Sequence, residues 1–311
     1  MAAPPRISIV TPCLNRAGFI RAAVESVLAQ HYPNVEHLIA DGGSTDGTLE
    51  ILAEYPHLQV VSEPDLGLYD ALNKAVARAT GDVIGHLNSD DLYPSGCLHA
   101  VAAAFAAAPD AGMVAGGAEL LAARPGGGWQ VVCDYPAARH APLSLREITI
   151  GAPIINARFF RRAVYARVGG YDPAYPIAAD RDFLLRAAIA GVSGPVVPQT
   201  LYQYRAHAGS LTMQAGGPHA LACIREYLRM AERYLADPAM PAHVRAACRR
   251  WHGKAAIDGA LEALRDGRPG DALRFAWAGW RHAPLFPAAL GGSILWRLAR
   301  MPLRPMFKGR M

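Results

Sequence analysis

Short apolar runs alternate with amphipathic segments over the first ninety residues. Four runs have the length and composition of buried strands, and the three segments between them have apolar residues at helical spacing. The predicted strands are 6–11 (ended by Pro12), 36–40, 58–62 and 83–87, and the predicted helices are 17–30, 46–55 and 69–80. This alternation predicts an α/β fold with a mostly parallel sheet flanked by helices, whose ligand lies beyond the carboxyl ends of the strands.

The pattern changes after Ser95. Further helices are predicted at 98–107 and 183–190, and further strands at 112–116, 129–134 and 200–205. Beyond Gly216 the chain is predicted to be helical, over 218–235, 241–264 and 269–280. We therefore expect a catalytic-sized domain over residues 1–212 and a helical C-terminal region over 213–311.

Composition and charge narrow the class of protein. With 52% hydrophobic and 18% charged residues the chain can bury a sizeable core, which excludes intrinsic disorder. The net charge is +5, but seven of the 31 basic residues follow Asp271, where no acidic residue occurs. The remaining 24 basic residues are outnumbered by 26 acidic residues, which gives the rest of the chain a net charge of −2. We therefore expect no nucleic-acid partner.

The cysteines and the chain ends bear on location. Five widely spaced cysteines without a CxxC pair argue against a zinc site or a disulfide framework and favour a reducing cytoplasm. No signal peptide is predicted, and the uncharged stretch 283–296 is too short to span a bilayer. Trp, Phe and Arg in the tail suit peripheral contact with anionic lipid at the inner face of the membrane, or helices that pack on the catalytic domain.

Three polar clusters follow the predicted strands. Asn88-Ser89-Asp90-Asp91 offers hard oxygen ligands for Mg²⁺ or Mn²⁺, or else forms a polar turn. The segment 41–47 (DGGSTDG) permits close backbone approach to a ligand, or simply makes a tight connection. The segment 62–74 places Asp70 and Asn73 on one helical face and pairs Asp70 with Lys74 at i,i+4. Neither a dinucleotide fingerprint nor a phosphate-binding P-loop is present in the sequence.

Taken in order, ISIVTPCLN, ADGGSTDGT and SEPDLGLYDALNKAVARATGDVIGHLNSDD resemble the nucleotide-sugar half of family-2 inverting glycosyltransferases with the GT-A fold. The resemblance covers about residues 5–210 and is closest to bacterial enzymes that build exopolysaccharide and lipopolysaccharide. It implies a nucleoside-diphosphate sugar as donor and a glycan or lipid-linked acceptor.

The resemblance also implies which residues bind the donor. Pro12, Asn15 and Asp41 would line the nucleoside pocket, with Asp41 reading the base. The remaining residues expected beside the base, ribose and diphosphate are Asp65, Gly67, Asn73 and Ser89.

Metal binding is implied by the similarity of Asn88-Ser89-Asp90 to the DXD motif of the family. Asn88 replaces the usual first Asp, which leaves Asp90 as the main ligand of Mg²⁺ or Mn²⁺ and Asp91 as a helper. His207, in the segment 204–210, resembles the late histidine that completes the divalent site or bonds the diphosphate.

The catalytic base is implied by Ala178-Ala179-Asp180-Arg181-Asp182, where Ala179 stands in place of the common Glu. An inverting transfer needs one carboxylate to accept the proton of the attacking hydroxyl. Motif position favours Asp180. Asp182 points to another side of a helix, and the alternative for it is an ion pair with Arg186 at i,i+4.

Two other classes of function stay open at this point. A sugar-nucleotide nucleotidyltransferase shares the α/β sheet and an Asp-bound metal, but it needs a basic phosphate-gripping loop, and Arg16 and Arg21 are isolated. A non-catalytic nucleotide-sugar-binding relative is the other, because Asn88 and Ala179 depart from the family pattern.

Overall fold

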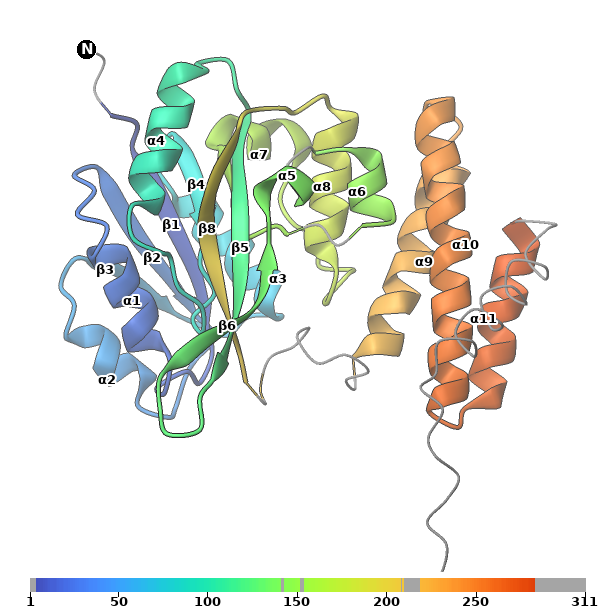
Figure 1. Ribbon diagram of the computed structural model, residues 1–311, viewed down its shortest axis with the longest axis horizontal. Helices are drawn as coiled ribbons and strands as arrows, with labels where there is room; N and C mark the ends of the chain where they lie inside the picture. Colours follow the sequence, from blue (N-terminus) through green and yellow to red (C-terminus); the bar gives the residue numbers. More distant parts are fainter. Residues whose placement is uncertain (1–3, 141–142, 152–153, 208, 210–218, 283–311) are drawn as a thin grey trace, which may run out of the picture. The chain divides into compact units, whose positions relative to one another are not determined.

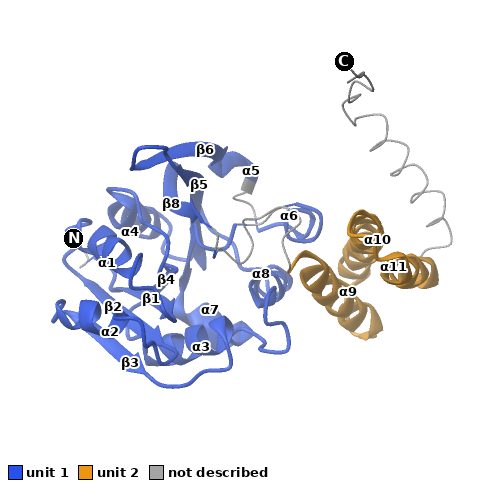
Figure 2. Ribbon diagram, turned by 90° about the horizontal axis from the view of Figure 1, so that it is seen from below, with its two compact units in different colours: residues 1–214 blue, residues 215–311 orange. Residues whose placement is uncertain are grey.

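A computed structural model describes residues 4–282 apart from 141–142, 152–153, 208 and 210–218. The chain divides into two compact units, residues 1–214 and 215–311, which Figure 2 colours separately. Each unit has its own hydrophobic core. The uncharged stretch 283–296 and the basic positions after it lie outside the described residues.

The first unit is built on an eight-stranded sheet (Figure 1). The strands are β1 (Ile7–Cys13), β2 (Val35–Asp41), β3 (Leu58–Ser62), β4 (Val83–His86), β5 (Met113–Ala123), β6 (Trp129–Tyr135), β7 (Arg158–Arg161) and β8 (Val196–Ala206). Their order is β3-β2-β1-β4-β7-β5-β6, and β8 pairs with β5. Strands β1 to β4 are parallel, whereas β7 is antiparallel to β4 and β5. The predicted α/β class is therefore confirmed.

Helices cover both faces of this sheet. They are α1 (Ile20–Leu28), α2 (Thr48–Ala53), α3 (Leu68–Arg78), α4 (Cys97–Ala107), α5 (Ala137–His140), α6 (Leu145–Thr149), α7 (Arg162–Val168) and α8 (Ala179–Ile189). Ala23 and Val27 of α1 and Leu98 of α4 share a core with Ile7 and Ile9 of β1. Helix α3 covers the opposite face of β1 and β2, as Figure 2 shows.

Pro12 does not end the first strand, contrary to the sequence-based expectation. Leu87 N donates to Val10 O on one side of β1, and Gly42 N donates to Cys13 O on the other. The backbone groups of successive strand residues point alternately to the two neighbouring strands. The backbone nitrogen of Pro12 therefore points toward β4 rather than β2. Strand β4 pairs with β1 only as far as Val10, so no ladder bond is lost at the missing N–H of Pro12.

Helices α5, α6 and α7 were not predicted, and β5 and β8 are longer than expected; α8 and β7 also differ from the prediction. Helix α8 begins at Ala179 rather than at residue 183, so Asp180 and Asp182 both lie in its first turn. Strand β7 was not predicted, because its sequence RFFR has only two apolar residues between arginines. Its Arg158 is nevertheless buried, and the guanidinium Nε donates to Ile154 O over 2.9 Å.

The described part of the second unit forms three helices, α9 (Ala220–Ala236), α10 (Ala242–Arg265) and α11 (Pro269–His282), as predicted. Both α9 and α11 pack on α10. A Cβ atom on Gly259 would lie 2.5 Å from the ring of Phe275, so glycine is needed where α10 and α11 approach closely. Among the described residues, no helix combines the length and the apolar composition needed to cross a bilayer.

Candidate active site

The parallel strands end together in a polar edge of the sheet. Cys13, Asp41 and Ser62 are register partners at the carboxyl ends of β1, β2 and β3. The buried Asp41 Oδ2 accepts hydrogen bonds from Gly43 N, Ser44 N and Ser62 Oγ at 3.0, 2.9 and 2.6 Å. Burial alone would raise the pKa of Asp41, but these bonds lower it, so the carboxylate is ionised at neutral pH.

Asn15 fastens the loop after β1 to the loop after β2. Its N–H donates to Ser44 Oγ over 2.7 Å, and its Oδ1 accepts from Thr45 N over 2.9 Å. Its φ of 52° lies in the left-handed region, which Asn tolerates better than most residues. Pro12 is buried in the strand just before this loop. Pro12, Asn15 and Asp41 are thus brought together at one edge of the sheet.

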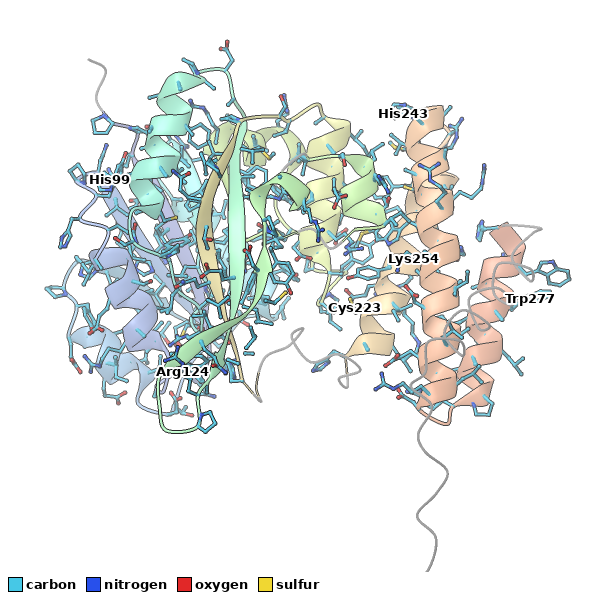
Figure 3. All side chains as sticks on the ribbon, in the orientation of Figure 1. His99, Arg124, Cys223, His243, Lys254 and Trp277 are labelled. Carbon is cyan, nitrogen blue, oxygen red and sulfur yellow. The ribbon has the colours of Figure 1, made fainter. Side chains whose placement is uncertain are left out.

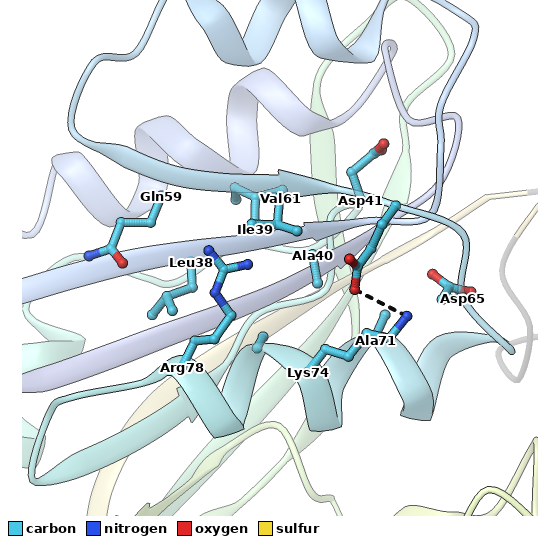
Figure 4. Close-up of a pocket in the computed structure, with 12 residues that line it drawn as sticks. Leu38, Ile39, Ala40, Asp41, Gln59, Val61, Asp65, Ala71, Lys74 and Arg78 are labelled. Carbon is cyan, nitrogen blue, oxygen red and sulfur yellow. Dashed lines mark ion pairs between the residues drawn. The ribbon is translucent and has the colours of Figure 1, made fainter.

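A groove beside this edge lies between α3 and strands β2 and β3 (Figure 4). Asp41 and Asp65 line one end of the groove and Arg78 the other. Lys74 Nζ lies 3.3 Å from Glu63 Oε1 and 3.2 Å from Asp70 Oδ2. The predicted i,i+4 ion pair of Lys74 with Asp70 is therefore confirmed.

Asp65 and Gly67 form the turn that leads into α3. Asp65 Oδ1 accepts from Gly67 N over 2.8 Å. Gly67 has a φ of 111°, which a residue with a Cβ atom adopts only with strain. A Cβ atom on Gly42 would lie 2.6 Å from Asp65 Oδ2, so this turn touches the glycine loop after β2.

Asn73 of α3 is bound to the loop before α8. Its Nδ2 donates to Tyr171 O over 2.8 Å, and Tyr171 N donates to its Oδ1 over 2.8 Å. The amide is therefore paired with backbone at both ends. In this arrangement Asn73 holds the loop of Gly170 and Tyr171 against α3.

Asp90 and His207 meet from distant parts of the chain. His207 Nε2 lies 2.9 Å from Asp90 Oδ2, and both side chains are largely buried. Gly209 N donates to His207 Nδ1, which places the proton on Nε2, facing the carboxylate. The ring of Phe19 stacks on His207 with centroids 4.3 Å apart, and Arg16 Nε lies 3.8 Å from Asp90 Oδ2.

Asp91 faces the interior instead. Tyr202 OH and Asn88 Nδ2 donate to its Oδ2 at 2.7 and 3.0 Å, and Arg205 N donates to its Oδ1 at 2.9 Å. Burial, together with the charge of Asp90, raises the pKa of Asp91 to about 7. Asp91 therefore fastens the turn after β4 to β8.

Asp180 lies in the first turn of α8 and is half-buried. Burial raises its pKa, although Arg181 and a hydrogen bond from Tyr69 act in the opposite direction. Burial also raises the pKa of Tyr204, as do the charges of Asp91 and Asp180. Tyr204 of β8 is thus within electrostatic reach of the turn after β4 and of Asp180.

The alternative predicted for Asp182, an ion pair with Arg186, is confirmed. Its side chain is fully buried, and Arg186 Nε lies 2.7 Å from Asp182 Oδ2. Arg186 Nη2 also donates to Gly170 O over 2.7 Å. Asp182 is thus part of the packing of α8 against the preceding loop.

Three tyrosines that received no role in the sequence analysis surround these carboxylates: Tyr69, Tyr202 and Tyr204. The last two alternate on β8, with ring centroids 4.6 Å apart, so period-two spacing could have placed them on one face. Tyr69 contacts Asp180 from a helix more than a hundred residues earlier, and no local pattern reveals that contact.

The donor set of this edge fits a hard divalent cation. Asp90 and His207 present one oxygen and one nitrogen, 2.9 Å apart. Ser89 is buried and hydrogen-bonded to the Cys13 thiol, and both oxygens of Asp91 are occupied by protein donors. Of the three predicted metal ligands, Asp90 and His207 lie together and Asp91 is turned inward.

Solved structures of similar fold support the GT-A architecture for the first unit. S. aureus TarS 1–349 in complex with UDP-GlcNAc superposes with a TM-score of 0.66 at 17% identity, covering 88% of this chain and 81% of that one. The mannosyltransferase PcManGT from Pyrobaculum calidifontis in complex with GDP-Man and Mn²⁺ gives 0.59 at 18% identity, covering 96% and 82%.

The family follows from sequence comparison. The model of Glycosyl transferase family 2 matches residues 8–119. An uncharacterized glycosyltransferase of Mycobacterium tuberculosis is 35% identical over 195 residues, or 61% of this chain and 71% of that protein. A PGL/p-HBAD biosynthesis glycosyltransferase of Mycobacterium bovis is 32% identical over 190 residues, or 59% and 70%. The chain belongs to glycosyltransferase family 2.

Proposed function

We propose that this glycosyltransferase moves one sugar, with inversion, from a nucleoside-diphosphate donor to a hydroxyl of a glycan or lipid-linked acceptor in cell-surface polysaccharide synthesis. The observation that carries the proposal is the contact of Asp90 with His207, which directly follows β8, at the carboxyl edge of the sheet. A cell-surface product is supported by the PGL/p-HBAD biosynthesis relative and by a putative teichuronic acid biosynthesis glycosyltransferase of Bacillus subtilis. The latter is 40% identical over 94 residues, or 29% of this chain and 37% of that protein.

The donor would lie along the polar edge. Pro12, Asn15 and Asp41 are assigned to the nucleoside end. The groups assigned to the ribose and diphosphate are Asp65, Gly67, Asn73 and Ser89. Asp41 and Asn73 already hold backbone groups, so we assign them to shaping the pocket through the loops that they fasten. Similar folds are solved with UDP-GlcNAc and with GDP-Man, which supports a sugar nucleotide as donor.

The divalent ion of the proposal is Mg²⁺ or Mn²⁺. Asp90 Oδ2 would hold it, joined by His207 Nε2 once that nitrogen has released the proton that faces Asp90, while Asp91 would position the turn. When bound, such an ion neutralises charge on the leaving diphosphate. PcManGT was solved with Mn²⁺, which supports a divalent ion in this fold.

Asp180 is the proposed base. It accepts the proton of the acceptor hydroxyl while the oxygen bonds to the anomeric carbon and the bond from that carbon to the diphosphate oxygen breaks. The nucleoside diphosphate leaves with the electron pair, and the anomeric configuration inverts. Burial raises the pKa of Asp180, which makes it a stronger base than an exposed aspartate.

We assign catalysis to residues 1–212 and a supporting role to the helical region 213–311. The proposal includes work on the cytoplasmic side, with peripheral contact to the membrane. Leu273, Trp277 and Trp280 of α11 are all more than half exposed, and Arg274 adds positive charge beside them. Exposed tryptophan next to arginine is typical of contact with anionic lipid.

Thermal stability with a panel of nucleoside diphosphates, each with and without Mn²⁺, tests the donor half. We expect one nucleotide to raise the Tm only when Mn²⁺ is present, because a ligand that binds the native state stabilises it. Asp90→Asn should abolish that rise, whereas Asp110→Asn, an exposed control, should keep it. Equal rises in the two variants would refute the assigned metal site.

A further inference from the structure

A second cluster of metal-ligating groups lies in the helical unit. Glu232 of α9, His252 of α10 and His282 of α11 each offer a ligand atom, and the three atoms lie within 4.8 Å of one another. Among the described residues this is the only group of three or more such side chains. We propose that these residues form a transition-metal site of the Zn²⁺ class that joins the three helices.

The distances suit a small tetrahedral ion. His252 Nε2 lies 3.2 Å from Glu232 Oε1, and His282 Nε2 lies 3.8 Å from the same oxygen. Bonds of about 2.0–2.1 Å at tetrahedral angles separate two ligand atoms by about 3.3 Å. Small side-chain rotations would therefore bring all three atoms into bonding distance of one ion.

His282 distinguishes this cluster from a simple histidine–carboxylate pair. Two imidazoles from different helices direct Nε2 toward one carboxylate oxygen, and their ring centroids lie 4.3 Å apart at 62°. A hydrogen bond between Glu232 and His252 explains why those two side chains meet. It gives no reason for the imidazole of His282 beside them. A shared cation accounts for all three groups.

Burial adds to the argument. His252 is fully buried, and its Nδ1 has no hydrogen-bond partner among the described residues. A metal ion would bind at Nε2, the ring nitrogen that faces Glu232, and burial shields that nitrogen from competing water. Glu232 and His282 are partly exposed, so an ion could enter and water could fill the fourth position.

The ligand set separates this site from the proposed diphosphate site. Two imidazoles and one carboxylate favour Zn²⁺, Co²⁺ or Ni²⁺ over Mg²⁺. Because its three ligands come from α9, α10 and α11, the site would cross-link every helix described in this unit. Its effect would therefore be on stability.

The test uses the untagged full-length chain carrying Asp90→Asn, so that the proposed diphosphate site does not contribute. After chelation and desalting, we expect it to bind one Zn²⁺ per chain and to gain about 5 °C in Tm. His282→Gln and Glu232→Gln should each weaken binding at least about tenfold. His243→Gln, at an exposed position on α10 (Figure 3), is the matched control and should bind as the parent does.

Co²⁺ provides a second readout that does not depend on stability. The parent and His243→Gln should give the intense visible absorption of tetrahedral Co²⁺, and His282→Gln should not. Zn²⁺ affinity and Co²⁺ spectra that are the same in His282→Gln and His243→Gln would overturn the proposal. The proposed glycosyl transfer is unaffected by either result, because Asp90, His207 and Asp180 belong to the other unit.

Discussion

The Asn73 side chain and the backbone of Tyr171 form two reciprocal hydrogen bonds, each 2.8 Å long. They connect α3 to the loop that leads to Asp180. Asn73→Ala should destabilise the protein by about 1–3 kcal/mol, because it leaves two backbone groups without their partner. It should also reduce transfer more than donor binding, which a comparison of kcat with KM would measure.

Lys74→Ala is the matched control for that change. Lys74 is the next residue on the same helix, and its ion pairs with Glu63 and Asp70 are partly exposed. Exposed pairs contribute little to stability. Equal losses in the two variants would contradict the role given to the Asn73 amide.

Glu36 predicts how stability depends on pH. Burial would raise its pKa, but bonds from Ser8, Thr80 and Arg6 outweigh burial and lower the pKa from 4.5 to about 2. The stability that ionised Glu36 contributes is complete above its pKa in the unfolded chain and is lost as the pH falls from about 4.5 toward 2. This contribution amounts to at most about 3 kcal/mol.

Urea unfolding between pH 7 and pH 3 measures that effect. In Glu36→Gln the acid-induced loss of stability should be smaller than in the wild type, and stability at pH 7 should be lower. Glu54→Gln changes an exposed carboxylate paired with Arg21 and serves as the control. If Glu36→Gln lost as much unfolding free energy between pH 7 and pH 3 as the wild type does, another carboxylate would be responsible for the acid-induced loss of stability.

The raised pKa of Asp180 predicts the acid limb of the pH–rate profile. The base must be ionised, so kcat/KM should fall tenfold per pH unit below the pKa of Asp180. Since burial raises that pKa, the fall should begin at a higher pH than for an ordinary aspartate. A rate that stays constant down to pH 4 in the folded enzyme would argue against Asp180 as the base.

The exposed rings of α11 predict lipid binding. Trp277 and Trp280 are 57% and 52% exposed, and their centroids lie 5.2 Å apart. Replacing both with Ala should reduce co-sedimentation with anionic liposomes at least about threefold. Leu264→Ala, an equally exposed apolar position on α10, should have a smaller effect. Failure of the wild type to co-sediment would remove membrane contact from the proposal.

The sequence was sufficient for the features that depend on local spacing. Short apolar runs and helical spacing located β1 to β4 and α1 to α3, and the carboxyl ends of the parallel strands meet at one edge for any such sheet. The i,i+4 ion pairs of Lys74 and Arg186 follow from helix geometry in the same way.

Features that depend on distant contacts could not be predicted. Asn73 was assigned to the donor by resemblance, but its amide partner lies 98 residues away. Asp91 was expected to help bind metal, yet its side chain is buried and accepts a hydrogen bond from Tyr202 on β8. Strand β7 lacks an apolar signature because its arginines donate to backbone carbonyls, Arg158 to the nearby Ile154 O and Arg161 to the distant Ala111 O.

The most direct measurement of the proposed chemistry is a single-turnover assay of Asp180→Asn with donor, acceptor and Mn²⁺. We expect donor affinity within about twofold of the wild type and a transfer rate lower by about 10²–10⁴-fold, because the isosteric amide cannot accept the proton. Asp110→Asn should retain both. Transfer by Asp180→Asn at the wild-type rate would contradict the assignment of the base.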